Sequence, residues 1–141
     1  MLKFKIEDGG DWDSSFSQEF TITLLDNDIV KCIFNLSSTQ MSCGIKEISG
    51  INSLLNFCSE SNYRLEGIIK KVTETINNKF NYNDKEKYTC LQYAFIVMST
   101  TSKTITKYKK VLDKEQNITI GEEIENPNSG SKIRILTYKN V

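Results

Sequence analysis

The sequence predicts a single domain over residues 1–141, of mixed α/β (α+β) class, with a mixed central β-sheet and a few helices. Segments near both ends alternate apolar and polar residues with the period of two that is typical of strands. Between them, residues 65–80 carry apolar side chains at helical spacing. A chain of 141 residues is long enough to form one hydrophobic core. Together these features predict the element order β-β-β-β-α-β-α-β-β.

The first half of the chain contains the four predicted N-terminal strands. Apolar and charged residues alternate over residues 2–6, which predicts a short first strand. Residues 20–24 and 29–36 predict a β-hairpin, because Asp26-Asn27-Asp28 between them tolerates the left-handed backbone of a tight turn. Residues 41–48 predict a fourth strand that ends before Gly50.

The second half predicts helices that alternate with strands. Residues 51–62 are ambiguous and are compatible with a single helical turn, whereas the stripe of residues 65–80 predicts a long amphipathic helix. The apolar run of residues 88–98 predicts a central strand. Residues 102–112 predict one further helix, with N-cap candidates just before it. A final hairpin, with strands 118–125 and 132–138, is predicted around the turn Asn126-Pro127-Asn128-Ser129-Gly130.

Composition excludes several classes of function. The chain has no histidine, which rules out catalytic triads and metal motifs that depend on imidazole. Lysine plus arginine and aspartate plus glutamate both number 18, so long-range attraction to nucleic acid is not expected. No apolar run is long enough for a membrane span, and no secretory signal is present, so we expect a cytoplasmic protein without a membrane partner. In a reducing cytosol the four cysteines should be free thiols, and their wide spacing predicts no metal site. They are Cys32, Cys43, Cys58 and Cys90.

From Phe20 onward, this order of elements resembles the fold of the GCN5-related N-acetyltransferase (GNAT) family. The segments that carry the resemblance are 93–98, 102–112, 118–125 and 132–138. It implies a parallel pair of strands, 41–48 and 92–98, that splay apart to hold the cofactor acetyl-CoA. The turn at residues 126–130 is also similar to turns in small phage-encoded proteins of acetyltransferase type, which implies a phage or mobile-element origin.

The resemblance also implies site residues. The family binds the cofactor pyrophosphate with a Q/R-x-x-G-x-G/A loop at the start of the helix after the fourth strand. Arg64 and Gly67 match this pattern, whereas Glu66 adds a negative charge and Ile69 replaces the second small residue. An incidental helix start is the alternative interpretation.

A general base and a general acid are implied in the same way. Glu47 stands at the position of the family's base on the fourth strand, and Tyr108 at that of its acid on the last helix. Glu47 is equally compatible with a solvated face. Tyr108 lies on the apolar stripe of its helix, which favours a core residue with a satisfied hydroxyl.

These observations favour a non-catalytic binding or inhibitor protein on a GNAT-like scaffold. The segment between the first two predicted strands is too short for the two helices that form much of the acceptor wall in the family. The expected partner is a host protein or a small nucleotide, with no cofactor, and Trp12 and Phe16 are the predicted interface residues. The alternative is an acetyl-CoA-dependent N-acetyltransferase that uses Glu47 and Tyr108.

Two further partners follow from surface features. The last predicted helix has a lysine-rich face, which is a feature of nucleic-acid binding proteins. The zero net charge of the chain argues against this function. Edge strands of the two hairpins could pair between copies, which predicts a homodimer. The lysines are Lys103, Lys107, Lys109, Lys110 and Lys114.

Overall fold

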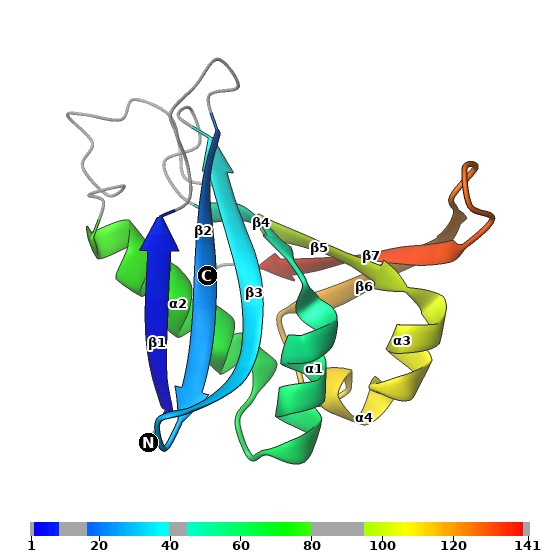
Figure 1. The fold of residues 1–141 in the computed structure, drawn as a ribbon. Helices are drawn as coiled ribbons and strands as arrows, with labels where there is room; N and C mark the ends of the chain where they lie inside the picture. The colour runs from blue at the N-terminus through cyan, green and yellow to red at the C-terminus, as the bar shows by residue number, and fades with distance from the viewer. Residues whose placement is uncertain (1, 9–16, 40–44, 80–94, 140–141) are drawn as a thin grey trace.

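The computed structural model describes residues 2–8, 17–39, 45–79 and 95–139. In these ranges seven strands form one sheet with the order β1-β2-β3-β4-β5-β7-β6 (Figure 1). The strands are β1 Leu2–Asp8, β2 Ser17–Asp26, β3 Ile29–Thr39, β4 Ile45–Ser49, β5 Phe95–Thr101, β6 Ile118–Glu125 and β7 Lys132–Lys139.

The centre of the sheet contains a parallel pair of strands, as the sequence predicts. Glu47 and Ile48 of β4 align with Val97 and Met98 of β5 in parallel register. All other neighbouring strands are antiparallel. The predicted mixed sheet is therefore confirmed.

Both predicted hairpins form around the residues expected to turn. Asn27 and Asp28 have φ of 53° and 65°, so both occupy the left-handed region that a two-residue hairpin turn requires. Gly130 closes the second hairpin with a φ of 71°, which glycine adopts without a steric cost.

One hydrophobic core lies on one face of the sheet. Alternate residues of β2, such as Phe20 and Ile22, are buried there, and those of β3, such as Phe34, join them. Their neighbours along the strands point to the opposite face, because successive side chains alternate. Ile33, for example, is 53% exposed. Within the described residues, the second face of the sheet therefore carries mostly exposed side chains.

Four helices of the described ranges contribute to this core, and α2 lies behind β1, β2 and β3 (Figure 1). Helix α1 is longer than predicted, because residues 51–60 form a complete helix rather than one turn. Ile51, Leu54, Leu55 and Cys58 are buried at the i, i+3, i+4, i+7 spacing of an amphipathic helix. The helices are α1 Ile51–Glu60, α2 Leu65–Lys79, α3 Ser102–Lys107 and α4 Lys109–Leu112.

The last predicted helix is interrupted at Tyr108, where φ is −107° and ψ is 25°. The prediction of one continuous helix was therefore wrong. The segment contains neither glycine nor proline, so the sequence gives no signal for this break. The predicted inward side chains Ile105, Val111 and Leu112 are nevertheless buried. The predicted N-cap is also present, since the Thr101 hydroxyl accepts a hydrogen bond from the Thr104 amide at 3.2 Å.

Some predicted features lie outside the described residues. These are the interface residues Trp12 and Phe16, the first part of the fourth strand at 41–44, and the chain from 80 to 94 that leads into β5. In the part of the chain that is described, the helices are too short or too polar to span a lipid bilayer.

Candidate functional site

The N-terminus of α2, where the GNAT resemblance implies an anion site, already holds a carboxylate of the protein itself. Glu115 lies after α4, and its side chain is only 1% exposed. One carboxylate oxygen accepts a hydrogen bond from the Leu65 amide at 3.0 Å, and the other accepts one from the Glu66 amide at 3.4 Å. The positive end of the helix dipole is therefore neutralised from within the chain.

Arg64 is directed to the same internal contact. Its Nη2 lies 3.5 Å from the Glu115 carboxylate and also donates a hydrogen bond to the Lys114 carbonyl oxygen. The arginine that the family pattern assigns to a pyrophosphate thus binds the chain segment 114–115. This contact could not be seen in the sequence, because about fifty residues separate the partners.

Glu66 and Gly67 complete the predicted loop without forming a cradle. Both Glu66 carboxylate oxygens accept hydrogen bonds from Asn117, one from its amide and one from its side-chain nitrogen. A methyl group added at Gly67 would have no atom within 4 Å, so no close backbone approach requires glycine there. These residues line a hollow of about 310 Å³ that Lys70, Tyr138 and Lys139 also border.

The helix that directly follows β4 is α1 and not α2, which places the family's loop position at residues 47–52. This segment reads Glu47-Ile48-Ser49-Gly50-Ile51-Asn52, with an acid where the pattern has glutamine or arginine. The Asn52 side chain accepts a hydrogen bond from Thr100 at 2.6 Å and so links α1 to the end of β5. At both helix starts the first glycine of the pattern is present, whereas its second small residue is replaced, by Asn52 in α1 and by Ile69 in α2.

The structure does not bring the predicted base and acid together. Glu47 is exposed, and its neighbour Ile48 is in the core, so the two side chains point to opposite faces of the sheet. Tyr108 is 9% exposed and belongs to the same core as Ile48. Its hydroxyl donates a hydrogen bond to Asn56 Oδ1 at 3.0 Å. The core interpretation of Tyr108 is the one that this contact supports.

Burial controls the titration of the groups around Glu115. Desolvation raises the pKa of Glu115, and the nearby Glu66 charge raises it further, whereas Arg64 and the two amide hydrogen bonds lower it. Burial, followed by the charges of Glu115 and Cys32, raises the pKa of Cys58 to about 12. Cys32 and Cys58 are both buried free thiols, as predicted, and neither is a reactive thiolate at neutral pH.

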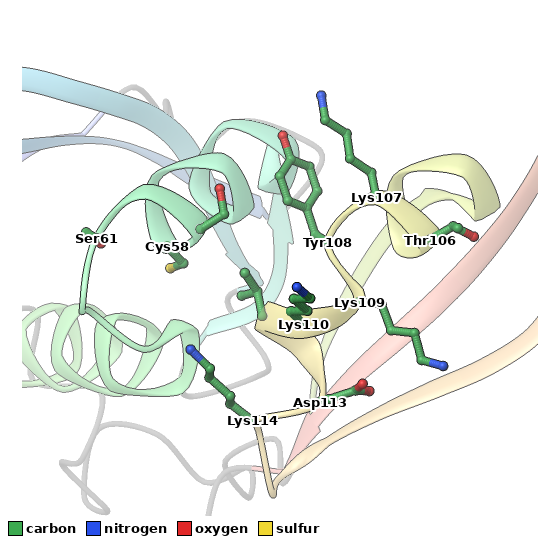
Figure 2. A pocket seen from close by; sticks show the side chains of 11 residues that line it. Cys58, Ser61, Thr106, Lys107, Tyr108, Lys109, Lys110, Asp113 and Lys114 are labelled. Carbon is green, nitrogen blue, oxygen red and sulfur yellow. The ribbon is translucent and has the colours of Figure 1, made fainter.

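A larger pocket lies between α1 and the α3–α4 segment (Figure 2). Its volume is about 710 Å³, within the range of small-molecule pockets. Lys107, Lys109, Lys110 and Lys114 line it together with Asp113. The lysine-rich face of this pocket was visible in the sequence. The sequence did not show that α1 forms the opposite wall.

The observed fold has the order of elements that the GNAT resemblance implies: an N-terminal antiparallel set of strands leads into a parallel β4–β5 pair and a C-terminal hairpin. No protein-family model and no curated protein matches the sequence. The chain is similar to the crystal structure of N-acetyltransferase from Staphylococcus aureus Mu50, at 18% identity with a TM-score of 0.45. That alignment covers 99% of this chain and 97% of the other.

Proposed function

We propose that this chain is a non-catalytic binding protein on a GNAT-like scaffold. The carrying observation is that neither helix start offers a free anion site: before α1 the acid Glu47 stands where the family pattern has glutamine or arginine, and the Glu115 carboxylate already occupies the N-terminus of α2. A pyrophosphate bound there would have to displace this carboxylate and its partner Arg64. It would also meet the negative charge of Glu66, which repels a phosphate of the same sign.

The positions of the two proposed catalytic residues support the same conclusion. Glu47 and Tyr108 lie on different sides of the sheet, and the Tyr108 hydroxyl is engaged by Asn56. General acid–base catalysis requires both groups within hydrogen-bond reach of one substrate. We therefore propose that acetyl-CoA is not a cofactor of this chain. The chain acts instead by binding a protein or a small nucleotide.

A thermal-shift titration tests this proposal, with acetyl-CoA and ADP compared at equal concentrations. A cofactor site of acetyltransferase type contacts the pantetheine arm, so it would bind acetyl-CoA more tightly than ADP. Any ligand of the native state alone raises the melting temperature. We expect acetyl-CoA to raise it no more than ADP does, and we expect no release of free coenzyme A thiol with amine acceptors. Stabilisation by acetyl-CoA that clearly exceeds that by ADP would overturn the proposal.

A further inference from the structure

We propose that the pocket between α1 and the α3–α4 segment binds a nucleotide, meaning a small molecule with several phosphates and a planar ring. This inference rests on the proposed function only in that the ligand is bound and not transformed. It names the small-molecule partner and the place where that partner sits. The pocket is defined by its lining residues from the C-terminal part of α1 and from residues 106–114.

The charge of the pocket differs from that of the whole chain. Four lysines and one aspartate line it, although positive and negative residues are equal in number over the full sequence. Among the described residues, no ion pair involves any of these lysines. Their ammonium groups are therefore available to an anion, and several phosphates would satisfy several of them at once.

The side chains of the lining point in different directions, and Lys114 is directed toward α1. Figure 2 shows Lys114 extending toward the Ser61 end of α1 and Lys107 extending past Tyr108, with the Lys107 Nζ 5.4 Å from the ring centroid. Lys109 and Asp113 point away from α1 in the same view. The only acidic side chain of the lining is thus on the side away from α1.

The wall behind the lysines is apolar. Cys58, Tyr108 and Val111 line the pocket, and all three are core residues with little exposure. A lysine rim over an apolar and aromatic wall suits a ligand that combines an anionic tail with a flat ring. Inorganic anions would use only the rim.

The concave shape favours a small ligand over nucleic acid. A nucleic-acid surface needs basic residues that follow a backbone over a length of several phosphates, and the zero net charge of the chain provides no long-range attraction. Lys103, which extends the basic face along α3, does not line the pocket.

Calorimetric titration of the full chain with ATP, inorganic triphosphate and a single-stranded DNA oligonucleotide tests the inference, at about 0.15 M salt. We expect saturable binding of ATP with a Kd of about 0.1 mM or tighter, weaker binding of triphosphate and still weaker binding of the oligonucleotide. The double variant Lys110→Glu with Lys114→Glu should weaken ATP binding about tenfold or more, since each substitution replaces a charged donor with a repelling group.

A matched control separates the pocket from overall charge. Lys31→Glu with Lys132→Glu makes the same change in net charge at exposed positions on β3 and β7, outside the pocket. Circular dichroism of both variants checks that they fold like the parent protein. We expect the control to bind ATP within about twofold of the parent protein, as surface charges at this salt are largely screened.

Four results would overturn the inference. They are absence of ATP binding, equal affinity for triphosphate and ATP, tighter binding of the oligonucleotide than of ATP, and equal weakening in the control variant. Failure of the proposed function has a separate signature. Acetyl-CoA binding that exceeds ADP binding and survives Lys110→Glu with Lys114→Glu would contradict the non-catalytic role and leave the nucleotide pocket untouched.

Discussion

Replacement of Glu115 separates the two roles of its carboxylate, namely the acceptor geometry and the negative charge. Glu115→Ala removes the acceptor of the Leu65 and Glu66 amides, at 3.0 and 3.4 Å, and the partner of Arg64. Glu115→Gln keeps the shape and one acceptor oxygen but removes the charge. The two variants therefore report on different parts of the same contact.

The expected losses in the free energy of unfolding follow from these contacts. Loss of a capping acceptor costs about 0.5–2 kcal/mol. The ion pair adds about 0–1 kcal/mol, because Arg64 is half exposed and solvent screens its charge. We expect Glu115→Ala to lose about 1–2 kcal/mol, and Glu115→Gln to lose less than about 1 kcal/mol at neutral pH.

The pH dependence has a definite sign. The folded protein raises the pKa of Glu115, chiefly by burial, so folding favours the protonated form of this carboxyl group. The stability that it contributes is present in full below its unfolded pKa and is lost as pH rises through the folded pKa. Glutamine does not titrate. The free energy of unfolding of Glu115→Gln should therefore increase relative to that of the parent protein as pH rises from about 4 to 7.

Urea unfolding of the parent protein and both variants at several pH values in this window measures these differences, with the m-value checked for constancy. If Glu115→Gln instead became steadily less stable than the parent protein with rising pH, the ionised carboxylate would be a net stabilising group. That result would refute the reasoning from burial.

Three further variants and one labelling experiment test other features. Tyr108→Phe should lose about 0.5–1.5 kcal/mol in urea unfolding, because it removes the hydrogen bond to Asn56; an unchanged free energy would show that this bond contributes nothing. Gly67→Ala should raise stability by about 0.5–1 kcal/mol, as the helix position has open space around it, and a loss there would indicate a constrained backbone. Gly130→Ala should lower stability by about 1 kcal/mol despite equally open space, because its φ of 71° is strained for alanine; unfolding that matches the parent protein would contradict this. Cys58, whose pKa is raised to about 12, should react with iodoacetamide at pH 8 far more slowly in the native protein than in urea, and equal rates by peptide mass spectrometry would show that the thiol is accessible.

Most strands and helices could be predicted because their signals are local. Alternation in β2 and β3, the turn at Asn27 and Asp28, and the apolar stripe of α2 all depend on residues close in sequence. The complete helix α1 also had a local signal, the spacing of Ile51, Leu54, Leu55 and Cys58, which its short length and polar flanks obscured. The break at Tyr108 had no local signal in the sequence.

The candidate site could be predicted only in part. The lysine-rich face was visible in the sequence, but the wall that α1 provides opposite it was not. Arg64 and Gly67 were implied as part of a phosphate loop by the GNAT resemblance, because their spacing matches the family pattern, with an incidental helix start as the alternative. The spacing contained no information on Glu115, which lies about fifty residues away.

By itself, the sequence determined the class of the fold, the position of the hairpins and the absence of imidazole chemistry, because periodicity, turn residues and composition are properties of the chain. Tertiary structure alone decided that the carboxylate of Glu115 fills the start of α2 and that Glu47 and Tyr108 face different sides of the sheet. Such contacts join residues that are distant in sequence, and their distances depend on packing rather than on local preference.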